Sequence, residues 1–344
     1  MNEVSFHPID DPGIARAWDE LAQATAAGPF ARHRWFSAWA RAFEAQVEVA
    51  AVHGSDAFAA VIRRGGRLRA PVNEESPEFE IVAVTPSARD RLIRGILIEG
   101  NTSCDFLKVG REFSDAIRNA AADRRVSEEV IQRSPYLELT GDWDSYEGSL
   151  SPSFRQGLRR KGRRLQNEGE VAVECYDGRE NLEELFREGL EVESSRWKAE
   201  QGTAIASRVE TRDFYEAIAR WLSEEEALRL WFLRVAGAPL AFRMDLIVEG
   251  VYYHLKGGYD PVSARFSPGL LLQHETVRHA FQQGLARYEF LGADEAYKMN
   301  WTKACRDRIA LRIFGSGIRG RVAWLERAVA RPLVKRILRH NPKA

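Results

Sequence analysis

The chain has 344 residues, of which 44% are hydrophobic and 29% are charged. These values are typical of a globular protein, and the length suits two domains of moderate size. Lysine plus arginine equals aspartate plus glutamate, at 50 each, so the net charge excludes a global attraction to nucleic acid and leaves only local basic patches for such a role.

The cysteines and the lengths of the apolar runs indicate the cellular compartment of the protein. Cys104, Cys175 and Cys305 are far apart and odd in number, which favours a reducing compartment over a disulfide framework, and their spacing is wrong for zinc. We therefore expect no metal. The first residues lack the basic start and apolar core of a signal peptide, and no apolar run reaches the ~18 residues that cross a bilayer. The sequence predicts a cytoplasmic protein.

The N-terminal part alternates between helical and extended patterns. Helices are predicted at 14–24 and 34–43, the second with a buried aromatic stripe that includes Trp35 and Trp39. Further strands and helices follow in an α/β pattern, at 47–52, 57–62, 81–84, 89–97, 106–109, 113–122 and 136–139. The acidic segment 71–80 is predicted to be a solvated loop. The alternative is that this loop overhangs the cleft that binds the acceptor.

A composition shift near residues 141–153 marks a linker, after which Ser151 is predicted to cap a basic helix that begins with Pro152 and ends at Gly169. The cations of this helix are Arg155, Arg159, Arg160, Lys161, Arg163 and Arg164. Two interpretations remain open. The run is either a solvated helix face or an electrostatic surface for a phosphate-rich donor or acceptor.

A second helix, predicted at 182–200, places Glu193 and Trp197 four residues apart on one face, where they could line one wall of a pocket. The alternative is structural, with Trp197 in the core and the charges in surface pairs. The hairpin 228–235 and 240–248 follows as scaffold.

The most informative segment is 251–272. A strand rich in β-forming residues is predicted to end at Gly257 and Gly258, which pair poorly and permit close approach of another backbone. A strand that stops pairing with its neighbour opens a slot in the sheet. An extended, amide-bearing ligand could form main-chain hydrogen bonds there.

The helix after that strand begins with Ser267, which is predicted to cap it, and Pro268, whose missing N–H costs nothing at the first position. Gly269 would let the N–H groups of Gly269, Leu270 and Leu271 converge on a phosphate at the positive end of the helix dipole, with Arg265 adding a charged contact. The alternative is an ordinary capped helix. A phosphate site beside a split sheet is the geometry that coenzyme A needs.

Six segments, in this order, resemble the GNAT acyltransferase superfamily, specifically its BioF-like/CelD-like acetyltransferases and, more distantly, the FemAB peptidyltransferases. They are FRQGLRRKGRRLQNEG, EVESSRWKAEQGTAI, DFYEAIARW, LRLWFLRVAGAPLAFRMDLIVEG, the strand and loop of 251–272, and RYEFLGADEAYKMNW. The resemblance covers 153–301 well and the first 145 residues loosely. It implies an α/β fold with a mixed (α+β) sheet and two GNAT-like domains in tandem.

The implied domains are a degenerate N-terminal GNAT-like domain over 1–145, an acyltransferase domain over 146–317 and a basic amphipathic helix over 318–344. Docking of that helix on the second domain is favoured over contact with a membrane surface. Its predicted apolar stripe is Ile318, Val322, Leu325, Val329 and Leu333.

The resemblance implies acetyl-CoA or another acyl-CoA as co-substrate, and a small-molecule or glycan amine as acceptor. The residues expected to bind the donor are Lys256, Gly257, Gly258, Arg265, Phe266, Ser267, Pro268, Gly269, Leu270 and Leu271. Glu193, Trp197 and Lys298 are expected at the acceptor. The chain departs from the Gln/Arg-x-x-Gly-x-Gly/Ala loop of many GNAT proteins, because Arg265 to Leu270 contains one glycine. This departure leaves the donor open between acyl-CoA and the aminoacyl-tRNA that FemAB-like relatives use.

Amide-forming transfer needs a base that takes a proton from the amine and an acid that returns one to the thiolate. Asp294 or Glu295 is a candidate base and Tyr297 a candidate acid. His254 is the other candidate base, since its reference pKa is near neutral; the alternative is a structural histidine.

The resulting prediction is an acyl-CoA-dependent N-acyltransferase in which an amine attacks the thioester directly. Two alternatives stay open. One is aminoacyl-tRNA-dependent peptidyl transfer, with residues 155–164 as the nucleic-acid surface; the other is a catalytically inactive GNAT-fold protein that senses CoA or holds a partner.

Overall fold

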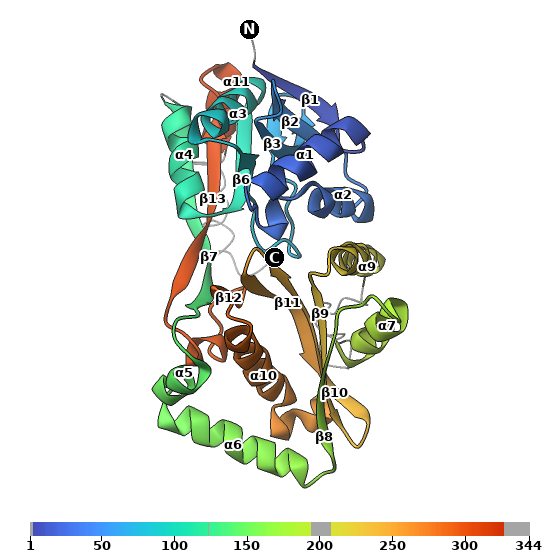
Figure 1. Ribbon diagram of the computed structural model, residues 1–344. Helices are drawn as coiled ribbons and strands as arrows, with labels where there is room; N and C mark the ends of the chain where they lie inside the picture. The colour runs from blue at the N-terminus through green and yellow to red at the C-terminus, as the bar shows by residue number, and fades with distance from the viewer. Residues whose placement is uncertain (1–2, 123, 194–207, 327–344) are drawn as a thin grey trace, which may run out of the picture. The chain divides into compact units, whose positions relative to one another are not determined.

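The computed structural model describes residues 3–122, 124–193 and 208–326 (Figure 1). The chain forms two compact units. The first comprises Met1–Ala40, Glu44–Gln132 and Asp307–Ala344, and the second comprises Arg41–Phe43 and Arg133–Arg306. The boundary predicted at 145/146 falls inside helix α5 (Trp143–Ser149) of the second unit. The strands β7 (Arg125–Glu138) and β13 (Cys305–Phe314) each contribute residues to both units.

The first unit is a mixed sheet with helices on its faces. Its strands lie in the order β1 (Val4–Pro8), β2 (Glu48–Val52), β3 (Ala57–Arg64), β4 (Arg67–Arg69), β6 (Ser103–Val109), β13 and β7, with β5 (Val82–Ala83) beside β3. β1 to β4 are antiparallel, whereas β4 and β6 are parallel. The helices are α1 (Pro12–Ala24), α2 (His33–Ala42), α3 (Pro86–Glu99), α4 (Arg111–Ala121) and α11 (Ile318–Leu325), with a 3-10 turn, η1 (Pro29–Ala31).

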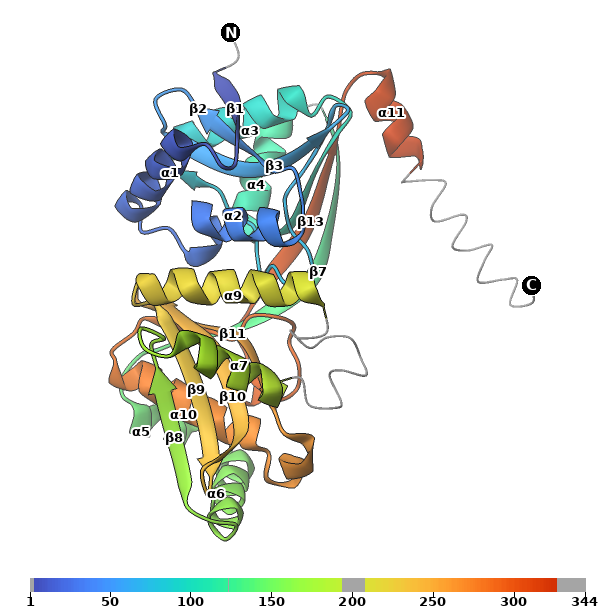
Figure 2. The same ribbon diagram turned by 90° about the vertical axis from the view of Figure 1, so that its right-hand side faces the viewer.

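The second unit has a sheet in the order β7, β12 (Arg287–Glu289), β11 (Val251–Tyr259), β10 (Ala238–Val248), β9 (Leu228–Val235) and β8 (Val171–Tyr176). β8 to β11 are antiparallel, and β11 and β12 are parallel. Helix α10 (Pro268–Gln282) covers one face, and α7 (Leu182–Glu193) and α9 (Val209–Glu224) cover the other (Figures 1 and 2).

One plan is repeated in the two units. The first runs β1, α1, α2, β2, β3, β4, α3, β6, and the second runs β8, α7, α9, β9, β10, β11, α10, β12. In both, three antiparallel strands are followed by a helix and a strand parallel to the last of the three, because a parallel neighbour needs a crossover connection. The repeat confirms the predicted mixed α/β fold with two similar domains in tandem.

The basic helix α6 (Pro152–Gln166) begins as predicted: the Ser151 hydroxyl accepts a hydrogen bond from the Phe154 N–H at 3.3 Å. It ends at Gln166, three residues before Gly169. Leu158 and Leu165 are its buried residues. They anchor the helix on α10 and on η3 (Pro261–Phe266), a 3-10 turn, and most of its cations are exposed.

The prediction that 71–80 is a solvated loop is wrong. Ser76, Glu78 and Phe79 are buried, and Lys108 Nζ donates hydrogen bonds to the carbonyl oxygens of Asn73 at 2.9 Å and Ser76 at 2.6 Å. The loop is held because the half-buried Lys108 ammonium donates hydrogen bonds to its carbonyl oxygens and Phe79 adds a buried aromatic anchor.

The prediction that the C-terminal helix docks on the second domain is wrong for the residues of that helix that the structure describes. Residues 318–326 belong to the first unit, and Arg125 stacks over the Trp324 ring at 4.2 Å. Ile318, Val322 and Leu325 are 82%, 49% and 50% exposed, so the predicted stripe is not buried there. Val329 and Leu333 lie outside the described residues. None of the helices that the structure describes is long and apolar enough to cross a membrane.

Two glycines let α7 lie directly on the sheet of the second unit. A Cβ on Gly189 would come within 2.3 Å of the Phe242 ring, and a Cβ on Gly258 would come within 2.7 Å of the Glu193 Cα. Such distances are far inside van der Waals contact. Close packing, rather than backbone conformation, therefore excludes any residue larger than glycine at positions 189 and 258.

Gly258→Ala should destabilise the protein by about 1–3 kcal/mol, because the added methyl group must push the backbone of α7 away from β11. Gly157→Ala in the middle of α6 is the matched control. Its Cβ would meet nothing within 4 Å, so helix propensity should stabilise this variant by about 0.5–1 kcal/mol. Urea unfolding midpoints measure both. Equal stability of Gly258→Ala and wild type would contradict the packing.

His274 on α10 lies between two carboxylates. Its Nε2 is 3.1 Å from Glu147 on α5, and its Nδ1 is 3.2 Å from Glu275. Burial lowers the pKa of His274, but hydrogen bonds and charge from Glu275 and Glu147 outweigh it, so the pKa is raised above the ordinary 6.5. His274 thus links α5 to α10, where Trp143 also packs edge-on against its ring at 5.0 Å.

His274→Gln should remove a pH-dependent part of the stability. Because the folded pKa is raised, the contribution of His274 is full below the unfolded pKa of about 6.5 and is lost as the pH rises through the folded value. The difference in unfolding free energy between wild type and His274→Gln, measured in urea, should therefore be largest near ~pH 6 and should shrink as the medium becomes alkaline. A difference that grows with pH would contradict the ion pairs.

Candidate active site in the second unit

The parallel pair β11 and β12 separates within the second unit. β12 pairs with β11 only from Val251 to Tyr253, opposite Arg287 to Glu289, whereas β11 continues along β10 to Tyr259. Gly257 and Gly258 pair with Arg243 and Phe242 of β10. The prediction that the glycines end the strand is therefore wrong, because both keep their antiparallel partners. β11 does separate from a neighbouring strand, which is β12, but the separation begins at His254, three residues before Gly257.

The first turn of α10 differs from the predicted anion site. Ser267 is in the left-handed region (φ 51°, ψ 55°) and its side chain makes no capping hydrogen bond. Its carbonyl oxygen instead accepts from the N–H groups of Leu270 at 3.0 Å and Leu271 at 3.2 Å. These two N–H groups are thus engaged by the turn itself. Of the predicted three, the N–H of Gly269 is the one without an acceptor among the described residues.

Gly269 also has a packing role, because a Cβ there would lie 3.2 Å from Cδ1 of Tyr259. Arg265 is 70% exposed at the end of η3, where it pairs with Glu168 at 3.5 Å and stacks over the Phe266 ring at 4.5 Å. Phe266 is buried in the core with Leu272. Of the predicted donor residues around this turn, Arg265 is thus an exposed cation that an anion can reach, and Phe266 is part of the core.

A buried polar network lies where β11 and β12 separate. Asp245 on β10 has no exposed surface, and its Oδ1 is 2.7 Å from His254 Nδ1. Its Oδ2 accepts from the Tyr252 hydroxyl at 2.6 Å and from Arg243 Nε at 3.1 Å. Arg243 also donates to the Tyr288 hydroxyl of β12 at 2.5 Å. The network therefore ties three strands together.

Arg243 and Asp245 were missed from the sequence. Their signal is two opposite charges at alternate positions of a strand that is otherwise almost wholly apolar, Ala241 to Val248. Charges on one face of a buried strand must find partners, and here they find each other.

Electrostatics within the network set the protonation states. Burial raises the pKa of Asp245, but Arg243, His254 and Tyr252 outweigh it, so the pKa lies below its ordinary value and the carboxylate is ionised. Burial and the Arg243 charge lower the pKa of His254 to about 4, although Asp245 acts in the opposite direction. His254 is thus a neutral imidazole at physiological pH.

The loop after β12 carries the other predicted catalytic residues. Lys298 is 5% exposed, and its Nζ donates to the Leu291 carbonyl oxygen at 2.7 Å and contacts Glu295 at the same distance. Asp294 pairs with Arg133 at 3.3 Å. Glu295 and Asp294 are therefore held in ion pairs, and Lys298 fixes the loop instead of offering a free cation to an acceptor.

Tyr297 keeps its proton at neutral pH. Its side chain is 45% exposed; partial desolvation and, to a lesser extent, the charge of Glu295 raise its pKa to about 12, and Arg243 acts in the opposite direction. Lys298 Nζ lies 5.6 Å from the centre of the Tyr297 ring, so the loop that Lys298 fixes also carries the phenol.

The predicted acceptor residues are only partly described. Glu193 is buried at the end of α7 against Gly258. Trp197 lies outside the described residues. Lys256 has its Nζ over the Tyr215 ring of α9 at 5.3 Å. Among the described residues, no group of histidine, cysteine, aspartate or glutamate side chains is arranged to hold a metal ion.

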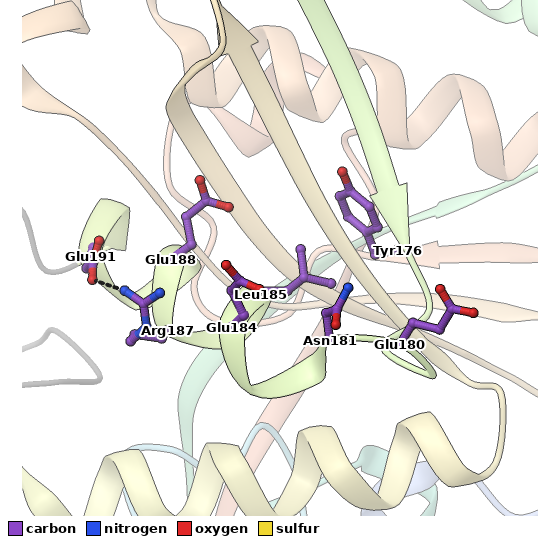
Figure 3. A pocket seen from close by; sticks show the side chains of 8 residues that line it. All are labelled: Tyr176, Glu180, Asn181, Glu184, Leu185, Arg187, Glu188 and Glu191. Atoms are coloured by element: carbon purple, nitrogen blue, oxygen red, sulfur yellow. Dashed lines mark hydrogen bonds and ion pairs between the residues drawn. The ribbon is translucent and has the colours of Figure 1, made fainter.

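Two surface pockets lie elsewhere in the second unit. The first, about 420 Å³, is lined along α7 and β8 by acidic residues such as Glu180, Glu184 and Glu188 (Figure 3). The second, about 530 Å³, is lined by Cys175 to Glu180 and Arg229. None of the predicted donor, acceptor or catalytic residues lines either pocket.

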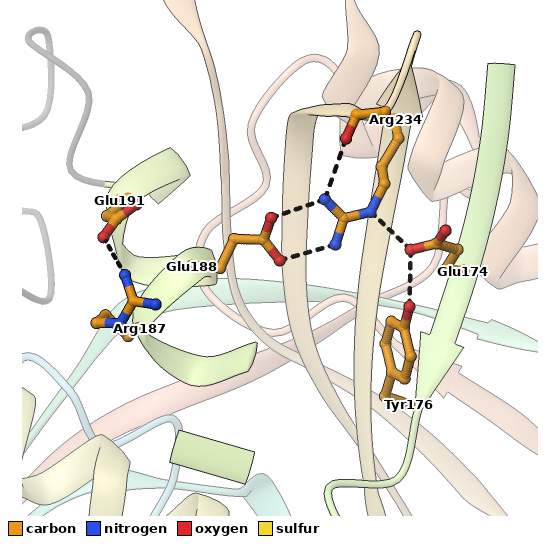
Figure 4. A network of polar contacts seen from close by, with 7 residues as sticks. Glu174, Tyr176, Arg187, Glu188, Glu191 and Arg234 are labelled. Carbon is orange, nitrogen blue, oxygen red and sulfur yellow. Dashed lines mark hydrogen bonds and ion pairs between the residues drawn. The ribbon is translucent and has the colours of Figure 1, made fainter. Parts of the chain in front are cut away.

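The acidic wall of the first pocket has a structural explanation. Arg234 on β9 forms a two-pronged pair with Glu188, both N···O distances being 2.7 Å, and its Nε is 2.6 Å from Glu174 on β8 (Figure 4). Arg187 pairs with Glu191 at 2.8 Å. The carboxylates of Glu174 and Glu188 thus bind α7 and β8 to β9, so we assign them to the scaffold.

Comparison with known proteins agrees with this architecture. Residues 152–299 match the family model of an acetyltransferase (GNAT) domain, whereas no curated protein matches the sequence. The C-terminal domain of a protein described as a lysylphosphatidylglycerol synthetase from Agrobacterium fabrum is 13% identical, with a TM-score of 0.62 over 92% of this chain and 96% of its own.

Two further solved structures share the fold. L-PGS from Bacillus licheniformis is 12% identical, with a TM-score of 0.60 over 94% of this chain and 98% of its own. FemX is 12% identical, with a TM-score of 0.61 over 90% of this chain and 97% of its own. Residues 152–299 thus match a GNAT acetyltransferase domain, and the solved structures share the fold of this chain.

Proposed function

We propose that the second unit transfers an acyl group from an acyl-CoA to the amine of a small molecule or glycan. The observation that carries this proposal is the position of His254. It is the first residue of β11 beyond the end of pairing with β12, and it is a neutral imidazole hydrogen-bonded to Asp245. An extended amide-bearing arm could enter where β12 leaves β11 and bring its thioester beside a base.

In the proposed reaction the amine nitrogen attacks the thioester carbonyl carbon, so a C–N bond forms and the C–S bond breaks. His254 takes the proton that the amine loses, and Tyr297 supplies a proton to the departing thiolate. A pKa of about 12 suits Tyr297 to the acid role because it is protonated at neutral pH. Asp294 and Glu295 are less suited to be the base because both are held in ion pairs.

The phosphates of the donor are proposed to lie at the start of α10. The Gly269 N–H and the exposed guanidinium of Arg265 are the groups that could meet them. Gly257 and Gly258 keep β11 free of side chains beside this path, and Lys256 adds a positive charge on the same strand.

Aminoacyl transfer from tRNA is a second candidate, favoured by α6. Its six cations, Arg155 to Arg164, form no ion pair among the described residues. A row of such cations is the kind of surface that binds a phosphate backbone. One structure with the same fold is the C-terminal domain of a putative lysylphosphatidylglycerol synthetase, a name that joins an amino acid to a lipid.

Calorimetric titration with acetyl-CoA and longer acyl-CoAs tests the first proposal. Wild type should bind, and Gly269→Glu should weaken binding at least about tenfold, since a carboxylate would occupy the place of the phosphates. Gly148→Glu on α5 adds the same charge where a Cβ meets nothing within 4 Å, and it should bind as wild type does.

The same experiment separates the candidates. Failure of wild type to bind any acyl-CoA would contradict the first proposal. Binding of aminoacyl-tRNA that weakens steeply with salt, and is lost in Arg159→Glu/Arg163→Glu, would favour the second.

A further inference from the structure

We propose that Asp245 is the positioning residue of this site. It holds His254 in the tautomer that carries its proton on Nδ1, so that Nε2 presents a lone pair to the acceptor amine. This inference rests on the proposed acyl transfer, in which His254 is the base.

Hydrogen bonding leaves Asp245 one oxygen for His254. Oδ2 is occupied by the Tyr252 hydroxyl at 2.6 Å and by Arg243 Nε at 3.1 Å. Oδ1 lies 2.7 Å from His254 Nδ1. Since Asp245 is fully buried, each of these three donors replaces water that the carboxylate has lost. Three donors on two oxygens thus fix the orientation of the carboxylate.

The tautomer follows from the charge of this carboxylate. An ionised carboxylate has no proton to donate, so the short contact requires Nδ1 to carry the hydrogen. The guanidinium of Arg243 keeps Asp245 ionised through a direct ion pair. In a neutral imidazole with a proton on Nδ1, the second nitrogen is an acceptor. Nε2 is therefore the atom able to take a proton.

The local backbone geometry of β11 sets the position of the His254 ring. Met244 pairs with Lys256 and Asp245 with His254, so Leu255 is an extra residue that forms a bulge in β11. Bulges re-aim the side chains beside them. A Cβ on Gly257 would lie 3.1 Å from Cε1 of His254. The ring edge that contains Cε1 therefore lies over a backbone without a side chain.

The support behind Asp245 is rigid. Arg243 donates to the Tyr288 hydroxyl on β12, which is 3.0 Å from Thr276 Oγ1 on α10. The Tyr252 and Tyr288 rings stack at 4.7 Å. Apolar side chains would fill this volume at lower desolvation cost. A charged network is required only if something nearby depends on an ionised carboxylate, and the histidine beyond it does.

The groups around His254 favour its neutral form. Arg243 on β10 and Lys298 on the loop after β12 lower its pKa, in addition to burial, and Asp245 raises it. Tyr252 is on its own strand, and α7 brings Glu193 to Gly258 on the same strand. At neutral pH the imidazole is therefore ready to accept a proton without first losing one.

Nitrogen-15 NMR of the imidazole in the full-length wild type is the first test. It should show His254 neutral at about pH 7 with the proton on Nδ1. A proton on Nε2, or on both nitrogens, would overturn the inference. This readout needs no substrate and no variant, so it is independent of whether acyl transfer occurs.

Asp245→Asn is the second test, because an amide can donate to Nδ1 and so favour the other tautomer. We expect kcat to fall by up to about 10⁴, because the wrong tautomer leaves no lone pair on Nε2, with KM changed by less than about threefold. The NMR signal should move to the Nε2–H tautomer. Unchanged kcat, or a lower kcat with the tautomer unchanged, would overturn the inference.

Tyr252→Phe is the matched control if Asp245→Asn folds poorly. It removes one hydrogen bond to Oδ2 and leaves the His254 contact and Arg243 in place. The tautomer should stay on Nδ1, and kcat should fall by less than about tenfold. A switch of tautomer in this variant would overturn the role assigned to Asp245.

Absence of acyl transfer in a wild-type protein that shows the expected tautomer would count against His254 as the base. It would leave the tautomer assignment standing.

Discussion

The ion pair of Arg243 and Asp245 is the constraint around which the second unit is organised. The two side chains are 4% and 0% exposed, so every polar atom that they carry must find a partner in the protein. Tyr252, His254, Tyr288 and Thr276 take part in satisfying them, which brings β10, β11, β12 and α10 into one arrangement. β11 and β12 separate next to this network, and the only described histidine in it stands at the point of separation.

Close packing on the opposite face of the same sheet supports that arrangement. Gly189 and Gly258 allow α7 to approach Phe242 and β11 directly, and Gly257 leaves room beside the His254 ring. At the outer edge, Arg234 holds Glu188 of α7 and Glu174 of β8. Small residues, buried charges and a partly buried guanidinium therefore keep β11 in place from both faces, which is what a base with a fixed orientation needs.

The repeat of one plan explains why only one of the two units has these features. The counterpart of β11 in the first unit is β4, which has the three residues Arg67–Arg69, whereas β11 has nine. β4 is too short to continue past its parallel neighbour β6 and carries no histidine. The loop that follows it is held by Lys108, whose ammonium binds loop carbonyls instead of a ligand. Among the described residues, the long strand with its histidine and buried ion pair therefore belongs to the second unit.

Periodicity and turn residues predicted the α/β class, the start of α6 at Ser151 and Pro152 and the importance of residues 251–272, whereas the tandem arrangement was implied by the resemblance to GNAT proteins. These features depend on neighbours along the chain, so local patterns reveal them. Only the tertiary structure decided that Gly257 and Gly258 stay paired, that the Ser267 carbonyl engages the first turn of α10, and that Lys298 fixes a loop. It also joined His254 to Asp245 across two strands through a bulge. Such contacts depend on strand register and on the space left by packing, which a single sequence does not encode locally.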